Sequence, residues 1–224
     1  MKNAKYRCVI FDCDGTLVDT LDDIASAMNQ SLARHGFPAA DREQYRSMTG
    51  WGTYKLAELV LPETARTDAN IQTVGNFAKE LMDKLPPEQS LSKPYPGIRE
   101  LLSRLNPLRP KKLKTAVISN KADSVLQRLM GDLFGAAAFD AVYGMCPGFS
   151  PKPDPAMVWD FLAGIDCSPH NAIFAGDSEI DIETARNAGC YPLGVSWGFR
   201  SRETLVQAGA ARIIDSPEEI LELL

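Results

Sequence analysis

The sequence predicts an α/β fold in which a mostly parallel sheet carries an inserted all-helical segment. Three observations predict it. Short β-rich runs alternate with helical patterns near the N-terminus and again from residue 114 onward. The stretch between them, residues 18–93, shows helical spacing and no convincing strand. A proline-rich segment, residues 86–97, marks its far end.

The predicted strands are six short apolar runs at residues 7–11, 114–119, 141–143, 172–175, 192–195 and 212–214. Helical patterns separate most of them, and such alternation is typical of βαβ units. Parallel strands place their carboxyl ends at one edge of the sheet, where open α/β sheets bind their ligands. The residues that follow each strand are therefore the first candidates for a functional site.

The insertion is predicted to be a helical cap. Its first helix is indicated by apolar residues at helical spacing: Leu21, Ile24, Ala25, Met28 and Leu32. Residues 54–61 and 71–85 also have helical patterns. We expect residues 1–17 and 94–224 to form the catalytic core and residues 18–93 the cap, with the proline-rich segment as a stiff hinge.

Composition excludes several classes of protein. The chain has 224 residues and a formal net charge of −5, and its one basic run, residues 109–114, is best interpreted as a solvated turn, so we expect no nucleic-acid partner. No apolar stretch approaches the roughly 20 residues of a membrane span. The five cysteines form no CxxC pair and favour a reducing compartment. We expect a soluble, cytoplasmic protein, monomeric or homodimeric, that acts on a small metabolite.

Four aspartates follow two of the predicted strands. Asp12 and Asp14 end the first run, in "FDCDGT", while Asp177 and Asp181 follow the run at 172–175 and stand one helical turn apart. Burying such carboxylates is costly unless a cation or hydrogen bonds neutralise them. Mg²⁺ binds carboxylate oxygens and leaves room for phosphate and water. The pattern therefore points to a magnesium and phosphate site.

Three further residues supply phosphate-binding chemistry. Ser119 and Asn120 end the run at 114–119, and Lys152 lies between two prolines in "SPKPDP". Each of these residues alone is more often a helix cap or a surface side chain. Together they are more informative, because three strand ends and one rigid loop supply phosphate- and metal-binding residues in the order that a single crevice needs.

These motifs together resemble those of the haloacid dehalogenase (HAD) superfamily. "FDCDGTLVDT", "VISN", "SPKPDP" and "GDSEIDIETARNAG" occur in the expected order across nearly the whole chain. The resemblance implies a Rossmann-like core with a mobile helical cap. It also implies Mg²⁺-dependent phosphoryl transfer through an aspartyl-phosphate.

The resemblance assigns a role to each motif residue. Asp12 would be the nucleophile and Asp14 the general acid and base, with Ser119, Asn120 and Lys152 on the phosphoryl oxygens. The implied catalytic residues are therefore Asp12, Asp14, Ser119 and Lys152. The implied metal ligands are Asp12, Asp177, the backbone carbonyl of Asp14, and Asp181, which would act through a bound water or else orient Lys152.

Substrate choice is less well determined by the sequence. The cap segment "SMTGWG" and the C-terminal tail resemble phosphoglycolate phosphatases. Gly50 and Gly52 could bring backbone amides to a substrate carboxylate or form a simple turn, and Arg46 could clamp that carboxylate or lie on the surface. A phosphatase of a small, phosphoglycolate-like phosphomonoester is favoured, with pyrophosphate, nucleotide and sugar-phosphate hydrolysis as alternatives.

Two other functions are disfavoured. A sugar-phosphate mutase of this family would carry a cap histidine at the position of Ile24, and an aliphatic side chain cannot relay a proton. A binding module without turnover would show an eroded motif, and all four motifs are intact.

Overall fold

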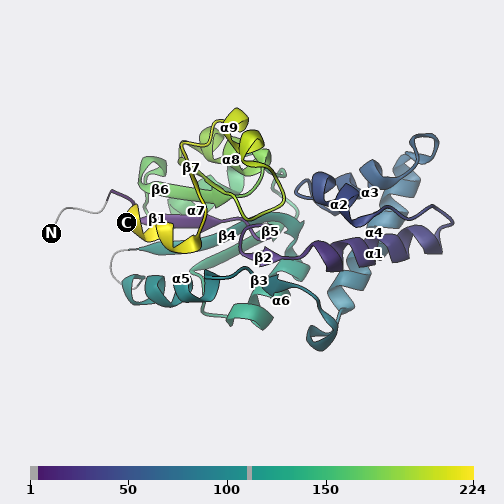
Figure 1. Ribbon diagram of the computed structural model, residues 1–224, viewed down its shortest axis with the longest axis horizontal. Coiled ribbons are helices and arrows are strands. Elements are labelled where there is room, and N and C mark those ends of the chain that lie inside the picture. Colours follow the sequence, from purple (N-terminus) through teal and green to yellow (C-terminus); the bar gives the residue numbers. More distant parts are fainter. Residues whose placement is uncertain (1–4, 110–112) are drawn as a thin grey trace.

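The computed structural model describes residues 5–109 and 113–224 (Figure 1). A six-stranded sheet of order β5-β4-β1-β6-β7-β8 forms the core, and every neighbouring pair is parallel. All six predicted strands are confirmed. Their bounds are β1 Cys8–Phe11, β4 Lys114–Ala122, β5 Ala141–Met145, β6 Ala172–Gly176, β7 Tyr191–Val195 and β8 Arg212–Ile214.

Helices cover both faces of this sheet. Successive side chains of a strand point to opposite faces, so Val9 and Phe11 of β1 pack with α5 and α6, whereas Cys8 and Ile10 pack with α7 and α8. The core helices are α5 Ile98–Leu105, α6 Asp123–Phe134, α7 Ala156–Gly164, α8 Glu179–Ala188 and α9 Arg202–Ala208. Short 3₁₀ turns occur at Glu63–Ala65, Pro87–Gln89, Asn106–Leu108, Pro169–Asn171 and Pro217–Glu222.

The insertion forms a helical cap at one end of the molecule (Figure 1). Its helices are α1 Leu21–Arg34, α2 Arg42–Met48, α3 Thr53–Val60 and α4 Asp68–Lys84. The helical spacing in α1 is confirmed, because Leu21, Met28 and Leu32 are buried in an apolar cluster of the cap. Tyr45 of α2 and Val74 of α4 complete its centre. The cap therefore has its own apolar core.

The expectation of no strand in the insertion is wrong at its two ends. Val18–Asp19 (β2) and Lys93–Pro94 (β3) pair as antiparallel strands and hold the two connections to the core together. The pair has only two residues on each side, too short to leave a periodic signal. Asp23, in the first turn of α1, reinforces it: its carboxylate accepts hydrogen bonds from the Ser90 and Ser92 hydroxyls, both at 2.6 Å.

The structure bears on two expectations drawn from composition, the absence of a membrane span and the role of the basic run. Within the described residues, no helix is long and apolar enough to cross a membrane. Part of the basic run, residues 110–112, lies outside the described residues. Its two ends, Arg109 and Lys114, both form ion pairs with Asp140 at 3.0 Å.

Candidate active site

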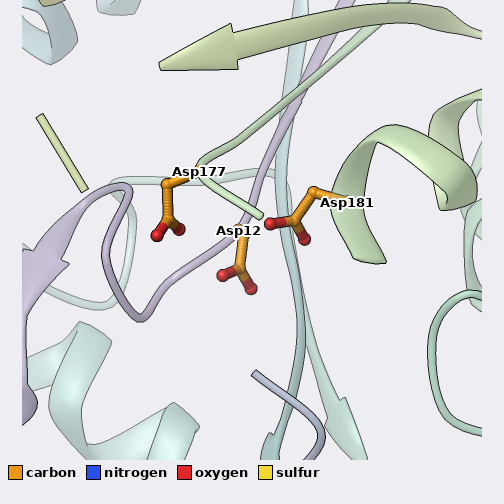
Figure 2. A group of neighbouring side chains, drawn as sticks. All are labelled: Asp12, Asp177 and Asp181. Carbon is orange, nitrogen blue, oxygen red and sulfur yellow. The ribbon is translucent and has the colours of Figure 1, made fainter. Parts of the chain in front are cut away.

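Three buried carboxylates meet at the carboxyl edge of the sheet. Asp12 follows β1, Asp177 follows the adjacent β6, and Asp181 lies in the first turn of α8 (Figure 2). One oxygen from each lies within 4.8 Å of the others, and each residue is at most 5% exposed. The parallel pairing of β1 with β6 therefore brings together the aspartates that the sequence predicted to meet.

Asp177 is fixed from two directions. Its Oδ1 accepts a hydrogen bond from the Thr16 hydroxyl at 3.0 Å, and its Oδ2 accepts one from the Phe199 amide at 2.7 Å. The loop after β1 passes so close that a Cβ on Gly15, whose φ is +85°, would lie 2.3 Å from Asp177 Oδ2. Only glycine allows this approach, which explains the glycine of "DGT".

Lys152 lies between two members of the cluster. Its Nζ donates to Asp12 Oδ1 at 2.7 Å and to Asp181 Oδ1 at 2.6 Å. The other oxygen of Asp181 accepts hydrogen bonds from the amide and hydroxyl of Ser178. Asp181 thus has partners at both oxygens, and it orients Lys152 while closing the first turn of α8.

The charges of the cluster are strongly coupled. Burial raises the pKa of Asp12, and the charges of Asp181 and Asp14 raise it further, while Lys152 opposes the change. Burial also raises the pKa of Asp177, and the charges of Asp181 and Asp12 raise it further. Burial favours a neutral Lys152, but the carboxylates of Asp12 and Asp181 outweigh it and raise the pKa of the amine. The cluster therefore has an excess of negative charge that a cation would relieve.

Asp14 lies beside the cluster rather than within it. One of its carboxylate oxygens accepts a hydrogen bond from the Thr20 hydroxyl at 2.6 Å and forms an ion pair with Lys121 Nζ at 2.8 Å. Lys121 is buried, and it was missed by the sequence analysis. The signal was available, because a lone cation directly follows "SN" at the end of a buried strand.

Ser119 and Asn120 are neighbours in β4. Both are buried and line the cavity described below. The side-chain Nδ2 of Asn120 donates to the backbone carbonyl oxygens of Lys152 and Gly50, both at 3.0 Å. Its Oδ1 accepts a hydrogen bond from the backbone N–H of Lys152 at 2.7 Å. In this structure Asn120 thus holds the lysine loop and the cap in place. A phosphate contact by either residue stays a prediction.

The predicted cap residues separate into two groups. Gly50 and Gly52 lie against the core, where a Cβ on Gly52 would come within 2.9 Å of the Asn120 carbonyl oxygen. Arg46 does not line the cavity; its Nε pairs with Glu43 at 3.0 Å on the surface. Arg200, which was not predicted, instead donates to the carbonyl oxygens of Arg46 and Thr49 at 2.5 and 2.7 Å.

A cavity lies between cap and core. Its floor is polar and comes from the strand ends, with Asp12, Asp14, Ser119 and Lys121 among its residues. Its cap side is mainly apolar. The cavity therefore lies between the apolar cap side and the carboxylates of Asp12 and Asp14.

The match to known proteins agrees with this geometry. Residues 9–195 match the family model described as "Haloacid dehalogenase-like hydrolase". The chain belongs to this family. The matched span begins in β1 and ends in β7, so it includes the carboxylate cluster, Lys152 and the cap.

Relatives of similar length include two named phosphatases. The N-acetylmuramic acid 6-phosphate phosphatase of Pseudomonas aeruginosa is 30% identical over 100% of this chain and 97% of its own. The phosphoglycolate phosphatase of Vibrio parahaemolyticus is 26% identical over 100% of this chain and 98% of its own. Both similarities cover the cap as well as the core.

A solved structure confirms the fold. A protein from Lactobacillus delbrueckii subsp. bulgaricus, proposed to be a phosphoglycolate phosphatase, superposes with a TM-score of 0.86 at 32% identity. The similarity covers 97% of each chain. The chain is therefore a hydrolase of this family, and its named relatives are phosphatases.

Proposed function

We propose that the protein is a Mg²⁺-dependent phosphatase that hydrolyses a small, phosphoglycolate-like phosphomonoester through an aspartyl-phosphate on Asp12. The observation that carries this proposal is the position of Asp12. Its carboxylate lies at the floor of the cavity, 2.7 Å from Lys152 Nζ and beside Asp177 and Asp181. A carboxylate needs no helper base to act as a nucleophile once it is ionised. Burial raises the pKa of Asp12, Lys152 opposes that change, and a bound Mg²⁺ would also favour the charged form.

The residues present suit Mg²⁺. Three buried carboxylates offer oxygen ligands within 4.8 Å of one another, and Mg²⁺ is a hard cation that favours such ligands. Asp12 and Asp177 would hold the ion with the backbone carbonyl of Asp14, while Asp181 acts mainly through Lys152. When bound, Mg²⁺ would neutralise the carboxylates and withdraw charge from the phosphoryl oxygens.

The chain's own residues account for both chemical steps. Asp12 forms a bond to phosphorus as the ester P–O bond breaks, and Asp14 gives its proton to the leaving alcohol. Asp14 then takes a proton from a water that attacks the phosphoaspartate, which releases phosphate and restores Asp12. Thr20 and Lys121 hold the Asp14 side chain near this path. Lys152 and Ser119 would stabilise the transferring phosphoryl oxygens.

A second substrate class has specific support. The mainly apolar cap side of the cavity suits a leaving group with more carbon atoms than glycolate, and a relative that matches the whole chain is an N-acetylmuramic acid 6-phosphate phosphatase. A sugar-phosphate phosphatase is therefore the second candidate. A mutase is not supported, because Ile24 lines the cavity and has no group that could transfer a proton.

The test is phosphate release from phosphoglycolate, N-acetylmuramic acid 6-phosphate, pyrophosphate and nucleotide monophosphates, with Mg²⁺ and with excess EDTA. Mg²⁺-dependent release concentrated on one ester would support the proposal and select between the candidates. An Asp14→Asn variant should lose kcat and keep Mg²⁺ and phosphate binding. An effect of this variant on KM alone would count against its acid and base role.

A further inference from the structure

The cap side of the cavity is mostly apolar and carries one charged side chain among the described residues. Helices α1, α3 and α4 contribute six apolar residues to it: Ile24, Ala27, Met28, Leu56, Ala78 and Met82. The uncharged residues Thr49, Gly50, Gly52 and Thr53 also line this side. Among the described cap residues that line the cavity, Lys79 of α4 carries the one charge. A leaving group lying against this wall would therefore meet one charged side chain on the described part of the cap.

The two buried lysines of the core belong to the proposed reaction centre. Lys121 pairs with Asp14, and Lys152 pairs with Asp12 and Asp181. Both lie among the carboxylates that the proposed chemistry assigns to the phosphoryl group and to Mg²⁺. The far end of the substrate, away from phosphorus, is therefore left to Lys79.

Lys79 is held in place by a contact that reaches the core. Its Nζ donates to Asp83 Oδ2 at 2.6 Å, and Asp83 Oδ1 accepts from the hydroxyl of Ser124, in α6, at 2.7 Å. An ammonium group has three protons, so pairing with Asp83 leaves donors for a further partner. The Asp83–Ser124 contact fixes Lys79 relative to the core as well as to its own helix.

A neighbouring lysine shows that this position is distinctive. Lys84, on the same helix, also pairs with an acid four residues away, Glu80 at 2.6 Å. Its side chain is 73% exposed, against 35% for Lys79, and it does not line the cavity. Lys84 is a solvated surface pair, whereas Lys79 combines a similar pair with a place in the cavity wall.

We propose that Lys79 binds an anionic group on the leaving alcohol, so that the enzyme favours phosphomonoesters of hydroxy acids over those of matching neutral alcohols. This inference rests on the proposed phosphatase function and assigns its specificity to one cap residue. The apolar residues around Lys79 strengthen the contact, because a charged hydrogen bond gains strength where water is partly excluded.

The experiment compares pairs of esters that differ in one group. 3-Phosphoglycerate and glycerol 3-phosphate differ by a carboxylate against a hydroxymethyl group, as do 6-phosphogluconate and glucitol 6-phosphate. The measured quantity is the ratio of kcat/KM within each pair, for the wild type and for Lys79→Met, Lys79→Arg and Lys84→Met. Circular dichroism and thermal unfolding verify that each variant folds.

We expect the wild type to prefer the acid in the pair that it hydrolyses faster, and Lys79→Met to reduce that ratio about tenfold, the usual value of a hydrogen bond to a charged group. Lys79→Arg should retain most of the preference, and Lys84→Met should leave the ratio unchanged. Turnover without a preference for the acid, or a preference that survives Lys79→Met, would overturn the inference alone. No Mg²⁺-dependent release from any ester would overturn the proposed function and the inference with it.

Discussion

Two buried carboxylate sites in this protein have opposite electrostatics. In the active site, Asp12 and Asp177 face other carboxylates, and burial and crowding raise the pKa of both. At the hinge, burial alone would raise the pKa of Asp23, but hydrogen bonds from the hydroxyls of Ser90 and Ser92 and the amides of Leu91 and Ser92 outweigh it and lower that pKa. The active-site cluster lacks compensating positive charge, whereas the Asp23 carboxylate is compensated by its hydrogen bonds.

The difference separates a functional site from a structural one. Asp23 accepts four hydrogen bonds from a single segment, residues 90–92, and thereby ties α1 to the second connection between cap and core. The active-site cluster has one lysine among three carboxylates. A protein retains such an unfavourable cluster where a cation and chemistry make use of it.

The largest expected effect is on catalysis at Asp12. Asp12→Asn keeps an acceptor for Lys152 and removes a charge that Asp181 and Asp14 disfavour, so we expect the free energy of unfolding to change by less than about 1 kcal/mol. Turnover should fall by at least about 1,000-fold, because an amide cannot replace the nucleophile. Phosphate release and urea unfolding measure the two effects. Near-normal turnover would refute the nucleophile assignment.

At the hinge, by contrast, a substitution should change the free energy of unfolding. Asp23→Ala leaves two hydroxyls and two amides without their acceptor, and we expect it to reduce the free energy of unfolding by about 3 kcal/mol. Asp22→Ala is the matched control: Asp22 is an exposed neighbour in the same helix, and its replacement should cost less than about 0.5 kcal/mol. Equal effects of the two variants in urea unfolding would show that the hinge contact contributes little.

Mg²⁺ should distinguish the two sites directly. A ligand that binds the folded protein at 100 times its Kd stabilises it by about 2.7 kcal/mol. We therefore expect Mg²⁺ to raise the Tm of the wild type and of Asp23→Asn by similar amounts, and to have little effect on Asp177→Asn. A full Mg²⁺ response in Asp177→Asn would remove Asp177 from the metal site.

The smallest effect concerns acid pH at the hinge. Because the pKa of Asp23 is lower in the folded protein, its contribution to stability is fully present above the unfolded value of about 3.9 and is lost as pH falls through the folded value. The difference in unfolding free energy between wild type and Asp23→Asn should therefore narrow below about pH 4. A difference that stays constant down to pH 2 would contradict the lowered pKa.

Sequence patterns predicted the parts of the molecule that depend on local order. Six strands follow from apolar runs, and Asp12, Asp177 and Asp181 could be brought together because parallel strands end at one edge. The contacts of Asp23 and Arg200 could not be predicted, since each joins segments that are far apart in the chain. The domain boundaries at residues 17/18 and 93/94 stay a prediction.

The ion-pair partners within the site could not be predicted, although Lys121 itself could have been noticed in the sequence. Lys121 directly follows two predicted residues, but its ion pair with Asp14 joins β4 to the loop after β1, and the two residues are 107 positions apart in the chain. Arg46 shows the reverse case. It was considered as a carboxylate clamp or a surface side chain; in the structure its Nε pairs with Glu43, and it is not among the residues that line the cavity.

The most direct test of the account is the chemical state of Asp12 during turnover. The protein is mixed with a hydrolysed ester and Mg²⁺ and quenched in acid at a series of times, and the peptide that contains Asp12 is analysed by mass spectrometry. We expect one phosphoryl group on Asp12 in the wild type and none in Asp12→Asn or in excess EDTA. Turnover with Asp12 unmodified at every time, or a phosphoryl group on another residue, would contradict the account.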